Sequence, residues 1–248
     1  MAALILAVAA TTSLRFFSAS LEQGLTRQAA SLLGADLILD SSRPLRPDVL
    51  REARQRGLQQ AVVTEFSSMI QRDDEFQLAA VKAITAAYPL RGELLARRGS
   101  TTLPAGSLPA TGTVWLDERL LGLLAVALDD EVQLGDIRLR VAAVLVREPD
   151  RGGNFSAFAP RALINADDVA AAGIIQPGSR VQYRLLLAGS PQAVKGFHDA
   201  LKPQLAVGER LLDVASGRSE IGTPLARASD YLSIAAIAAV VLSGLAVA

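Results

Sequence analysis

The apolar residues of this 248-residue chain gather at its two ends, and the charged residues lie between them. No Asp, Glu, Lys or Arg occurs before Arg15 or after Asp230. The run 231–248 approaches the roughly 20 apolar residues that a membrane-spanning helix needs. The run 1–14 is shorter, but apolar residues continue at three- and four-residue spacing over 14–32. This pattern predicts one continuous helix, apolar on all sides at first and then amphipathic.

Two interpretations of the N-terminal run compete. It is either the end of a membrane helix that continues into a stalk, or a signal peptide with a small-x-small cleavage site at Ala7-Val8-Ala9. The missing basic residues at the start and the unbroken helical pattern favour the first. At the other end, Thr223-Pro224 supplies a capping hydroxyl and a proline for the first turn of a helix. We therefore expect 1–33 to end one membrane helix and form a stalk, and 223–248 to form a stalk and begin the next.

Between these ends, two segments predict the same kind of structure. In 34–88, a strand "ADLILD", a helix "PDVLREARQR" and a hairpin of "QAVVTEFSSMI" and "EFQLAAVKAI" give β-α-β-β. In 179–222, a strand "RVQYRLLLAG", a helix that begins after Ser190 and a strand "ERLLDV" give β-α-β. Together the segments predict an α+β fold of the split ferredoxin-like kind, βαββ/βαβ.

The segment 89–178 separates the two halves and predicts an inserted mixed subdomain. It begins with a loop rich in Gly, Pro, Ser and Thr, followed by an apolar helix "LDERLLGLLAVAL". A hairpin follows in "EVQLGDIRLRVAAVLV". In its second arm Leu139 and Val141 alternate with Arg138 and Arg140, which indicates one buried and one solvated face.

Composition excludes several classes of function. Lys plus Arg equals Asp plus Glu, 25 against 25, and aromatic residues make up 4% of the chain. Both values argue against a nucleic-acid partner, which requires a basic surface and stacking side chains. Because the chain has no cysteine, it can form neither disulfides nor a thiolate zinc site. The mean hydropathy of +0.31 reflects the two ends.

Motifs that carry chemistry are also missing from the sequence. There is no phosphate-binding G-x-x-x-x-G-K-[ST] loop, no dinucleotide-binding G-x-G-x-x-G and no G-x-S-x-G serine elbow. We therefore expect the chain not to be an enzyme, and the sequence assigns no catalytic, cofactor-binding or metal-binding residue.

Three features of the sequence allow either a functional or a purely structural interpretation. His198 beside Asp199 could act as a general base or lie on the surface. The acidic triplets 73–75 and 129–131 could hold a divalent cation, or they could serve the turns in which Asp is common. The loop that carries Phe155 and Phe158 could contact lipid or a partner, or pack on its own domain.

Three stretches resemble one family of membrane proteins. "VKAITAAYPLRGEL", "TVWLDERLLGLLAVALDDEVQLGDIRLRVAAVLVREPD" and "FAPRALINADDVAAAGIIQPGSRVQYR" are similar to segments of the periplasmic domain of MacB/FtsX-like ABC transporter permeases, most closely the YbbP-type branch. These are packing and turn signatures that together cover nearly the whole chain. One position departs from the family, because Asp129 stands where relatives usually carry glycine.

The resemblance implies a porter-like domain formed by 34–88 and 179–222, with a sabre-like insertion at 89–178. It implies the non-catalytic part of a multi-pass permease of the bacterial inner membrane, with its main domain in the periplasm and no cofactor. Expected partners are the lipid bilayer, a homodimeric cytoplasmic ABC ATPase, a second permease copy and a periplasmic protein such as an esterase or lysophospholipase. The family mechanism is mechanotransmission, in which ATP hydrolysis drives the periplasmic extraction or export of a lipophilic substrate.

A different class of protein would also have apolar segments at both ends of its sequence. A membrane-anchored extracytoplasmic sensor or adhesion domain would have a cleaved signal peptide and a C-terminal anchor. It would lose residues 1–14, whereas a permease keeps them in the membrane.

Overall fold

The computed structural model describes residues 30–150, 159–176 and 178–213, and five helical positions before them: Thr12, Phe16, Ser20, Gly24 and Gln28. Apart from Thr12, both predicted membrane segments lie outside the described residues. Within the described parts of the chain, no helix combines the length and the apolarity that a membrane span requires. Residues 30–213 form one compact unit, which begins with the helical residues 30–33.

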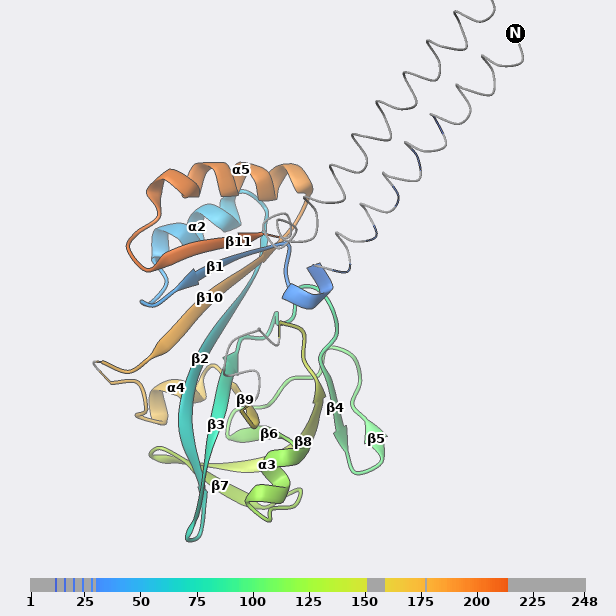
Figure 1. The fold of residues 1–248 in the computed structure, drawn as a ribbon, viewed down its shortest axis with the longest axis vertical. Coiled ribbons are helices and arrows are strands. Elements are labelled where there is room, and N and C mark those ends of the chain that lie inside the picture. Colours follow the sequence, from blue (N-terminus) through green and yellow to red (C-terminus); the bar gives the residue numbers. More distant parts are fainter. Residues whose placement is uncertain are drawn as a thin grey trace, which may run out of the picture. The chain divides into compact units, whose positions relative to one another are not determined.

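The described strands form one 11-stranded sheet (Figure 1). Its order is β11-β1-β10-β2-β3-β9-β6-β8-β4-β5, and β7 pairs with β2 and β8. The strands are β1 (Leu37–Ser41), β2 (Gln59–Arg72), β3 (Glu75–Ile84), β4 (Leu95–Arg98), β5 (Thr101–Thr102), β6 (Thr113–Asp117), β7 (Glu131–Leu134), β8 (Ile137–Arg147), β9 (Arg161–Asn165), β10 (Val181–Ala188) and β11 (Glu209–Asp213). The helices are α2 (Pro47–Gln55), α3 (Glu118–Leu123), α4 (Asp168–Ala171) and α5 (Pro191–Leu201), with a 3-10 turn at Lys202–Gln204.

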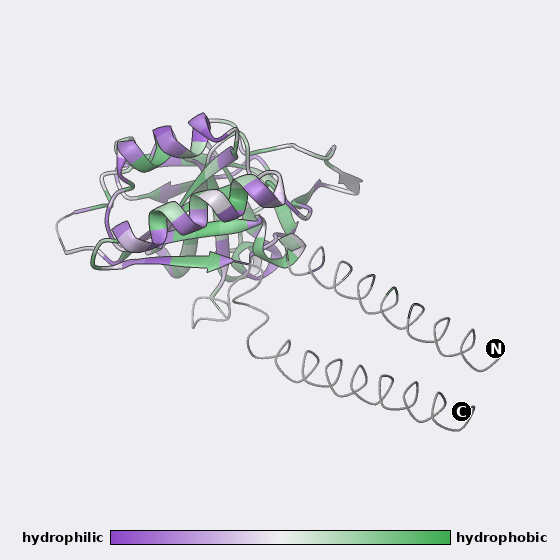
Figure 2. Ribbon diagram, turned by 90° about the horizontal axis from the view of Figure 1, so that it is seen from above, coloured by the Kyte–Doolittle hydropathy of each residue, from purple (hydrophilic) through white to green (hydrophobic). Residues whose placement is uncertain are grey.

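The two sequence segments predicted to form α+β pieces meet in one half of this sheet. Strands β11, β1, β10 and β2 pair antiparallel, and α2 and α5 lie on one face of them (Figure 1). Figure 2 shows that both helices carry apolar as well as polar residues, as expected of amphipathic helices. Leu39 and Leu185 of the strands pack there against Val49 of α2 and Phe197 of α5. The coarse prediction of an α+β fold is therefore correct.

Local sequence signals explain the helix boundaries in this half. The Ser190 side chain accepts a hydrogen bond from the Ala193 backbone N–H at 3.2 Å, and Pro191 occupies the first turn. At the end of α2, Gly57 adopts a left-handed φ of 72°, which closes the helix as predicted.

The second half of the sheet is continuous with the first. Strand β2 is 14 residues long, and it and β3 extend beyond β10. Strand β3 then pairs in parallel with β9. The region predicted to form the inserted subdomain, 89–178, thus shares its sheet with the flanking segments, and its exact boundaries stay a prediction. Its core includes Trp115 of β6 and Leu163 of β9, both buried.

The predicted apolar helix over 116–128 is much shorter in the structure. α3 has six residues, because the chain turns out of the helix at Ala125, whose φ is 49°. The Val126 N–H donates to the Leu121 carbonyl at 3.0 Å and the Ala125 N–H to the Gly122 carbonyl at 3.3 Å. This pattern is a Schellman C-cap formed without glycine at the left-handed position. Apolar spacing alone did not reveal it.

Asp129, where the family resemblance leads us to expect glycine, lies in a turn with a left-handed backbone. It adopts a φ of 72°, the left-handed conformation that glycine takes most easily. Its carboxylate pairs with Arg98 at 2.6 Å and with Arg140 at 2.8 Å. The two guanidinium groups supply contacts that a glycine could not make.

Candidate functional site

Charged side chains line the face of the sheet opposite α2 and α5. Side chains alternate between the two faces of a strand, so Leu39 and Leu185 face the helices, whereas their neighbours Asp40 and Arg184 face the other way. In the register of the sheet, Asp40 of β1 lies opposite Arg184 of β10, and Glu65 of β2 lies opposite Lys82 of β3. Three further residues complete what we call the buried charge cluster, which comprises Asp40, Glu65, Lys82, Glu148, Asp150, Arg161 and Arg184.

Lys82 is the centre of this cluster. It is 1% exposed, and three carboxylates surround its ammonium group. The Lys82 Nζ lies 2.9 Å from Asp150, 3.1 Å from Glu65 and 3.7 Å from Glu148. The Tyr88 hydroxyl donates a hydrogen bond to the same Asp150 oxygen at 2.6 Å. An isolated buried lysine would lose its charge, so the carboxylates are what allow an ammonium ion at this depth.

Two arginines bound the cluster on either side of Lys82. Arg184 lies 3.2 Å from Glu65 and 3.8 Å from Asp150, and Arg161 lies 2.8 Å from Glu148. Among the described residues, both Glu148 oxygens, Asp150 Oδ2 and the Nε atoms of Arg161 and Arg184 are buried without a well-aligned hydrogen bond. The Arg161–Glu148 contact is therefore a close ion pair of poor hydrogen-bond geometry.

The pKa values of the cluster follow from burial and charge. Burial alone would lower the pKa of Lys82, but Asp150, Glu148 and Glu65 outweigh it, and the pKa lies above its ordinary value. Burial alone would raise the pKa of Glu65, but Lys82 and Arg184 lower it. For Glu148, burial prevails over Lys82 and Arg161 and raises the pKa. Burial and the nearby Asp150 raise the pKa of Tyr88 well above its ordinary value.

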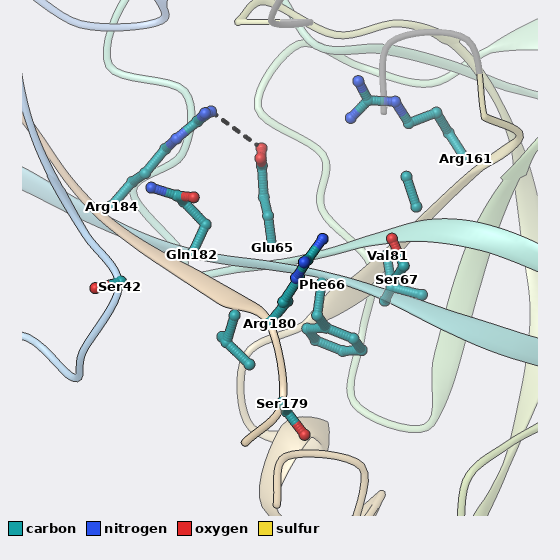
Figure 3. A pocket seen from close by; sticks show the side chains of 12 residues that line it. Ser42, Glu65, Phe66, Ser67, Val81, Arg161, Ser179, Arg180, Gln182 and Arg184 are labelled. Carbon is teal, nitrogen blue, oxygen red and sulfur yellow. Dashed lines mark hydrogen bonds and ion pairs between the residues drawn. The ribbon is translucent and has the colours of Figure 1, made fainter. Parts of the chain in front are cut away.

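A pocket of about 410 Å³ opens beside the cluster, where β10 begins (Figure 3). Its walls carry the side chains of three arginines and one acid, Glu65, together with serines and apolar residues. The lining residues are Ser42, Glu65, Phe66, Ser67, Ala80, Val81, Arg161, Ser179, Arg180, Val181, Gln182 and Arg184. We call it the arginine pocket.

The cluster is joined to the helical residues 30–33 through the backbone. The Asp150 N–H donates to the Leu32 carbonyl at 2.6 Å, while the Asp150 side chain binds Lys82 and Tyr88. The Gly34 carbonyl accepts hydrogen bonds from the N–H groups of Leu90 and Arg91 at 3.1 and 2.9 Å. These bonds form what we call the helix joint, which fixes the end of the helix to the sheet domain.

The candidates from the sequence lie away from this site. His198 is on α5, with its Nδ1 3.0 Å from Asp199. The two acidic triplets lie close together, and Arg72 bridges them: it is 3.8 Å from Asp73 and 3.2 Å from Asp130. Among the described residues, no group of three or more His, Cys, Asp or Glu side chains could hold a metal ion. Phe155 and Phe158 lie outside the described residues.

The charge cluster itself was not predicted. Two residues in the sequence could have indicated it: the lysine in the apolar strand "EFQLAAVKAI" and the glutamate in "AVVTEF". A charged side chain at an inward-facing strand position requires a partner of opposite charge. Chemically, the cluster pairs acids with bases, and the arginine pocket exposes one arginine, Arg180, to solvent.

The chain is similar in sequence to one curated protein. No family model matches it. It is 35% identical over 246 residues to the uncharacterized ABC transporter permease YbbP of Escherichia coli (strain K12), a match that covers 99% of this chain and 30% of YbbP.

One solved structure shows a similar fold. The periplasmic region of MacB from Actinobacillus actinomycetemcomitans matches with a TM-score of 0.51 at 15% identity, over 78% of this chain and 95% of that one. The extracellular domain of the transporter YknZ from Gram-positive bacteria gives 0.47 at 12% identity, over 71% of this chain and 100% of that one. The family resemblance seen in the sequence is confirmed: the chain is a homologue of part of an ABC transporter permease, and that part has the fold of the MacB periplasmic region.

Proposed function

We propose that this chain is the non-catalytic, periplasmic part of an ABC transporter permease that carries movement from membrane helices to the periplasm. In this mechanotransmission model, a separate cytoplasmic ATPase hydrolyses ATP and the domain acts on a lipophilic substrate by extraction or export. The match to YbbP over 99% of the chain carries the proposal. The absence of a phosphate-binding loop from the sequence is consistent with ATP hydrolysis in a partner.

The helix joint supports a lever mechanism. Its hydrogen bonds at Leu32 and Gly34 run between backbone groups, which cannot rotate away as side chains do. Arg91 adds a bidentate ion pair to Asp36, with distances of 3.0 and 2.7 Å. A tilt of the helix that ends at residue 33 would therefore move the sheet domain with it.

The remaining parts of the proposal concern the whole permease. We place it in the bacterial inner membrane as a multi-pass protein. Its partners are a homodimeric ABC ATPase, a second permease copy and a periplasmic esterase or other periplasmic protein. The chain spans less than a third of the length of YbbP, so these partners belong to the complete protein.

The helix joint can be tested with two matched glycines. Gly92 and Gly99 have φ values of 75° and 61°, so alanine at either costs about 1–2 kcal/mol of backbone strain. A Cβ at Gly92 would collide with the Ser31 carbonyl in the helix, whereas a Cβ at Gly99 meets open space. Gly92→Ala therefore disturbs the helix joint. Gly99→Ala introduces the same backbone strain without the collision, so it is the matched control.

The test uses the complete permease with its ATPase, and spin labels on the exposed Val207 and on the ATPase. We expect ATP to change the distance between the labels in the parent and in Gly99→Ala. In Gly92→Ala we expect that change to be lost at a temperature where the domain is still folded, although the collision should lower its melting temperature below that of Gly99→Ala. An unchanged ATP-dependent movement in Gly92→Ala would overturn the proposed lever.

A further inference from the structure

The arginine pocket is lined by more arginines than acids. Among its described lining residues, three arginines face a single acid, Glu65. That carboxylate is already shared, because Lys82 and Arg184 both bind it, at 3.1 and 3.2 Å. Arg161 and Arg184 also pair with carboxylates behind the lining, Glu148 at 2.8 Å and Asp150 at 3.8 Å, so Arg180 is the lining arginine without an ion pair to any described residue.

The individual arginines have donors to spare. The Arg161 side chain is 5% exposed, and its Nε is buried without a hydrogen-bond acceptor among the described residues. The Nε of Arg184 is in the same state. Arg180 is exposed and makes no hydrogen bond or ion pair with any described residue. Figure 3 shows these side chains around the pocket, with Glu65 paired to Arg184. A guanidinium with free donors is the group that best binds phosphate or carboxylate.

An apolar surface continues from the pocket along the same face of the β2–β3 hairpin. Ser67 and Ala80, which line the pocket, are paired across the two strands. The next pair on this face is Met69 and Leu78, and Phe76 lies one pair further. All three are among the exposed large hydrophobic residues. We call Met69, Leu78 and Phe76 the apolar strip, and from Ala80 to Phe76 it spans about 13 Å at roughly 3.3 Å per residue.

We propose that the arginine pocket and the apolar strip together bind an anionic amphiphile. Its phosphate or carboxylate head lies among Arg161, Arg180 and Arg184, and its apolar tail lies along Met69, Leu78 and Phe76. The unpaired Arg180 and the Nε donors of Arg161 and Arg184 select an anionic head, and the continuity of the strip with the pocket wall accommodates the tail. The proposal goes beyond the mechanical role above, since binding does not require the domain to move.

Calorimetric titration of the full 248-residue chain in dodecyl maltoside tests this, with the heat from empty micelles subtracted. The probes are hexyl phosphate, inorganic phosphate and hexanol. We expect hexyl phosphate to bind at least about tenfold more tightly than inorganic phosphate, because each buried CH₂ contributes about a fourfold factor. Hexanol, which lacks the charge, should show no saturable binding. Equal affinities for hexyl phosphate and inorganic phosphate would overturn the amphiphile and leave an ion site only.

Variants at exposed positions separate the two halves of the site. Arg180→Ala should weaken both phosphates about tenfold, since it removes one charge-assisted contact. Met69→Ser with Leu78→Ser should weaken hexyl phosphate and leave inorganic phosphate unchanged. Arg51→Ala, an exposed arginine on α2 behind the sheet, is the matched control and should change neither. Unchanged hexyl phosphate binding in Arg180→Ala, or in the double serine variant, would contradict the proposal. Because no ATPase is present, failure here leaves the proposed lever untouched.

Discussion

The domain contains two networks of alternating charge that differ in burial. Around Lys82, acids and bases from five strands and from residues 148–150 lie within 2.8–3.9 Å of one another, and Lys82 is 1% exposed. Around Asp129, the pairs with Arg98 and Arg140 are equally short, at 2.6 and 2.8 Å, but all three side chains are 44–52% exposed. Distance alone therefore does not distinguish the two networks.

Burial decides what each network does. In the exposed network, water screens the charges, and pairs of this kind contribute about 0–1 kcal/mol. In the buried network, the charges have lost most of their hydration, so each depends on its neighbours. The exposed network supports one turn, whereas the buried one fixes β2, β3, β10 and residues 148–150 in a single arrangement. Three predictions test this difference.

The largest effect is expected at the centre of the buried network. Lys82→Met leaves Glu65, Glu148 and Asp150 buried without their shared cation, which should lower the free energy of unfolding by about 3–5 kcal/mol. Urea unfolding of the full chain measures it. Lys195→Met, which removes an exposed lysine from α5, should change stability little. A loss below about 1 kcal/mol in Lys82→Met would show that the carboxylates do not need this partner.

A smaller, pH-dependent effect is expected for Glu65. Its pKa in the folded chain lies below the ordinary value of 4.5, so its charge adds stability above that pH, and this stability is lost as the pH falls through the folded pKa. Glu65→Gln should therefore be less stable than the parent at pH 7, and the difference should shrink below pH 4.5. Thermal melting at a series of pH values provides the measurement. A constant difference across this range would contradict the sign of the pKa shift.

The smallest effect is expected in the exposed network. Asp129→Gly loses two screened ion pairs but relaxes a left-handed backbone, so its melting temperature should stay close to that of the parent. Asp129→Ala loses the same pairs and keeps the strain, so it should melt below the glycine variant. If alanine were tolerated as well as glycine, the positive φ of 72° would not be the constraint at this turn.

The sequence predicted features that depend on neighbouring residues. The Ser190-Pro191 helix start and the alternation of Leu139 and Val141 with Arg138 and Arg140 are local patterns, and the structure confirms them. Strand β9 was missed because four consecutive buried residues, 161–164, give no alternation to detect.

The charge cluster could not have been assembled from local patterns. Its members come from β1, β2, β3, β9 and β10 and from residues 148–150, which only the pairing of distant strands brings together. Lys82 and Asp150, for example, are 68 positions apart. A charged residue in an apolar strand signals that a partner exists, but the partner's identity depends on the completed sheet.

The strand order has a consequence for how the chain is made. Strand β1 pairs with β10 and β11, so Leu37 meets Leu187 and Asp213, near the far end of the domain. At about 5–20 residues per second, a ribosome needs roughly 10–30 s to synthesise the intervening chain. During that time both edges of β1 await partners, and unpaired edges are sites of aggregation. We infer that the order of synthesis makes the first strand of this domain one of the last to be secured, so its folding yield depends on how that waiting strand is protected.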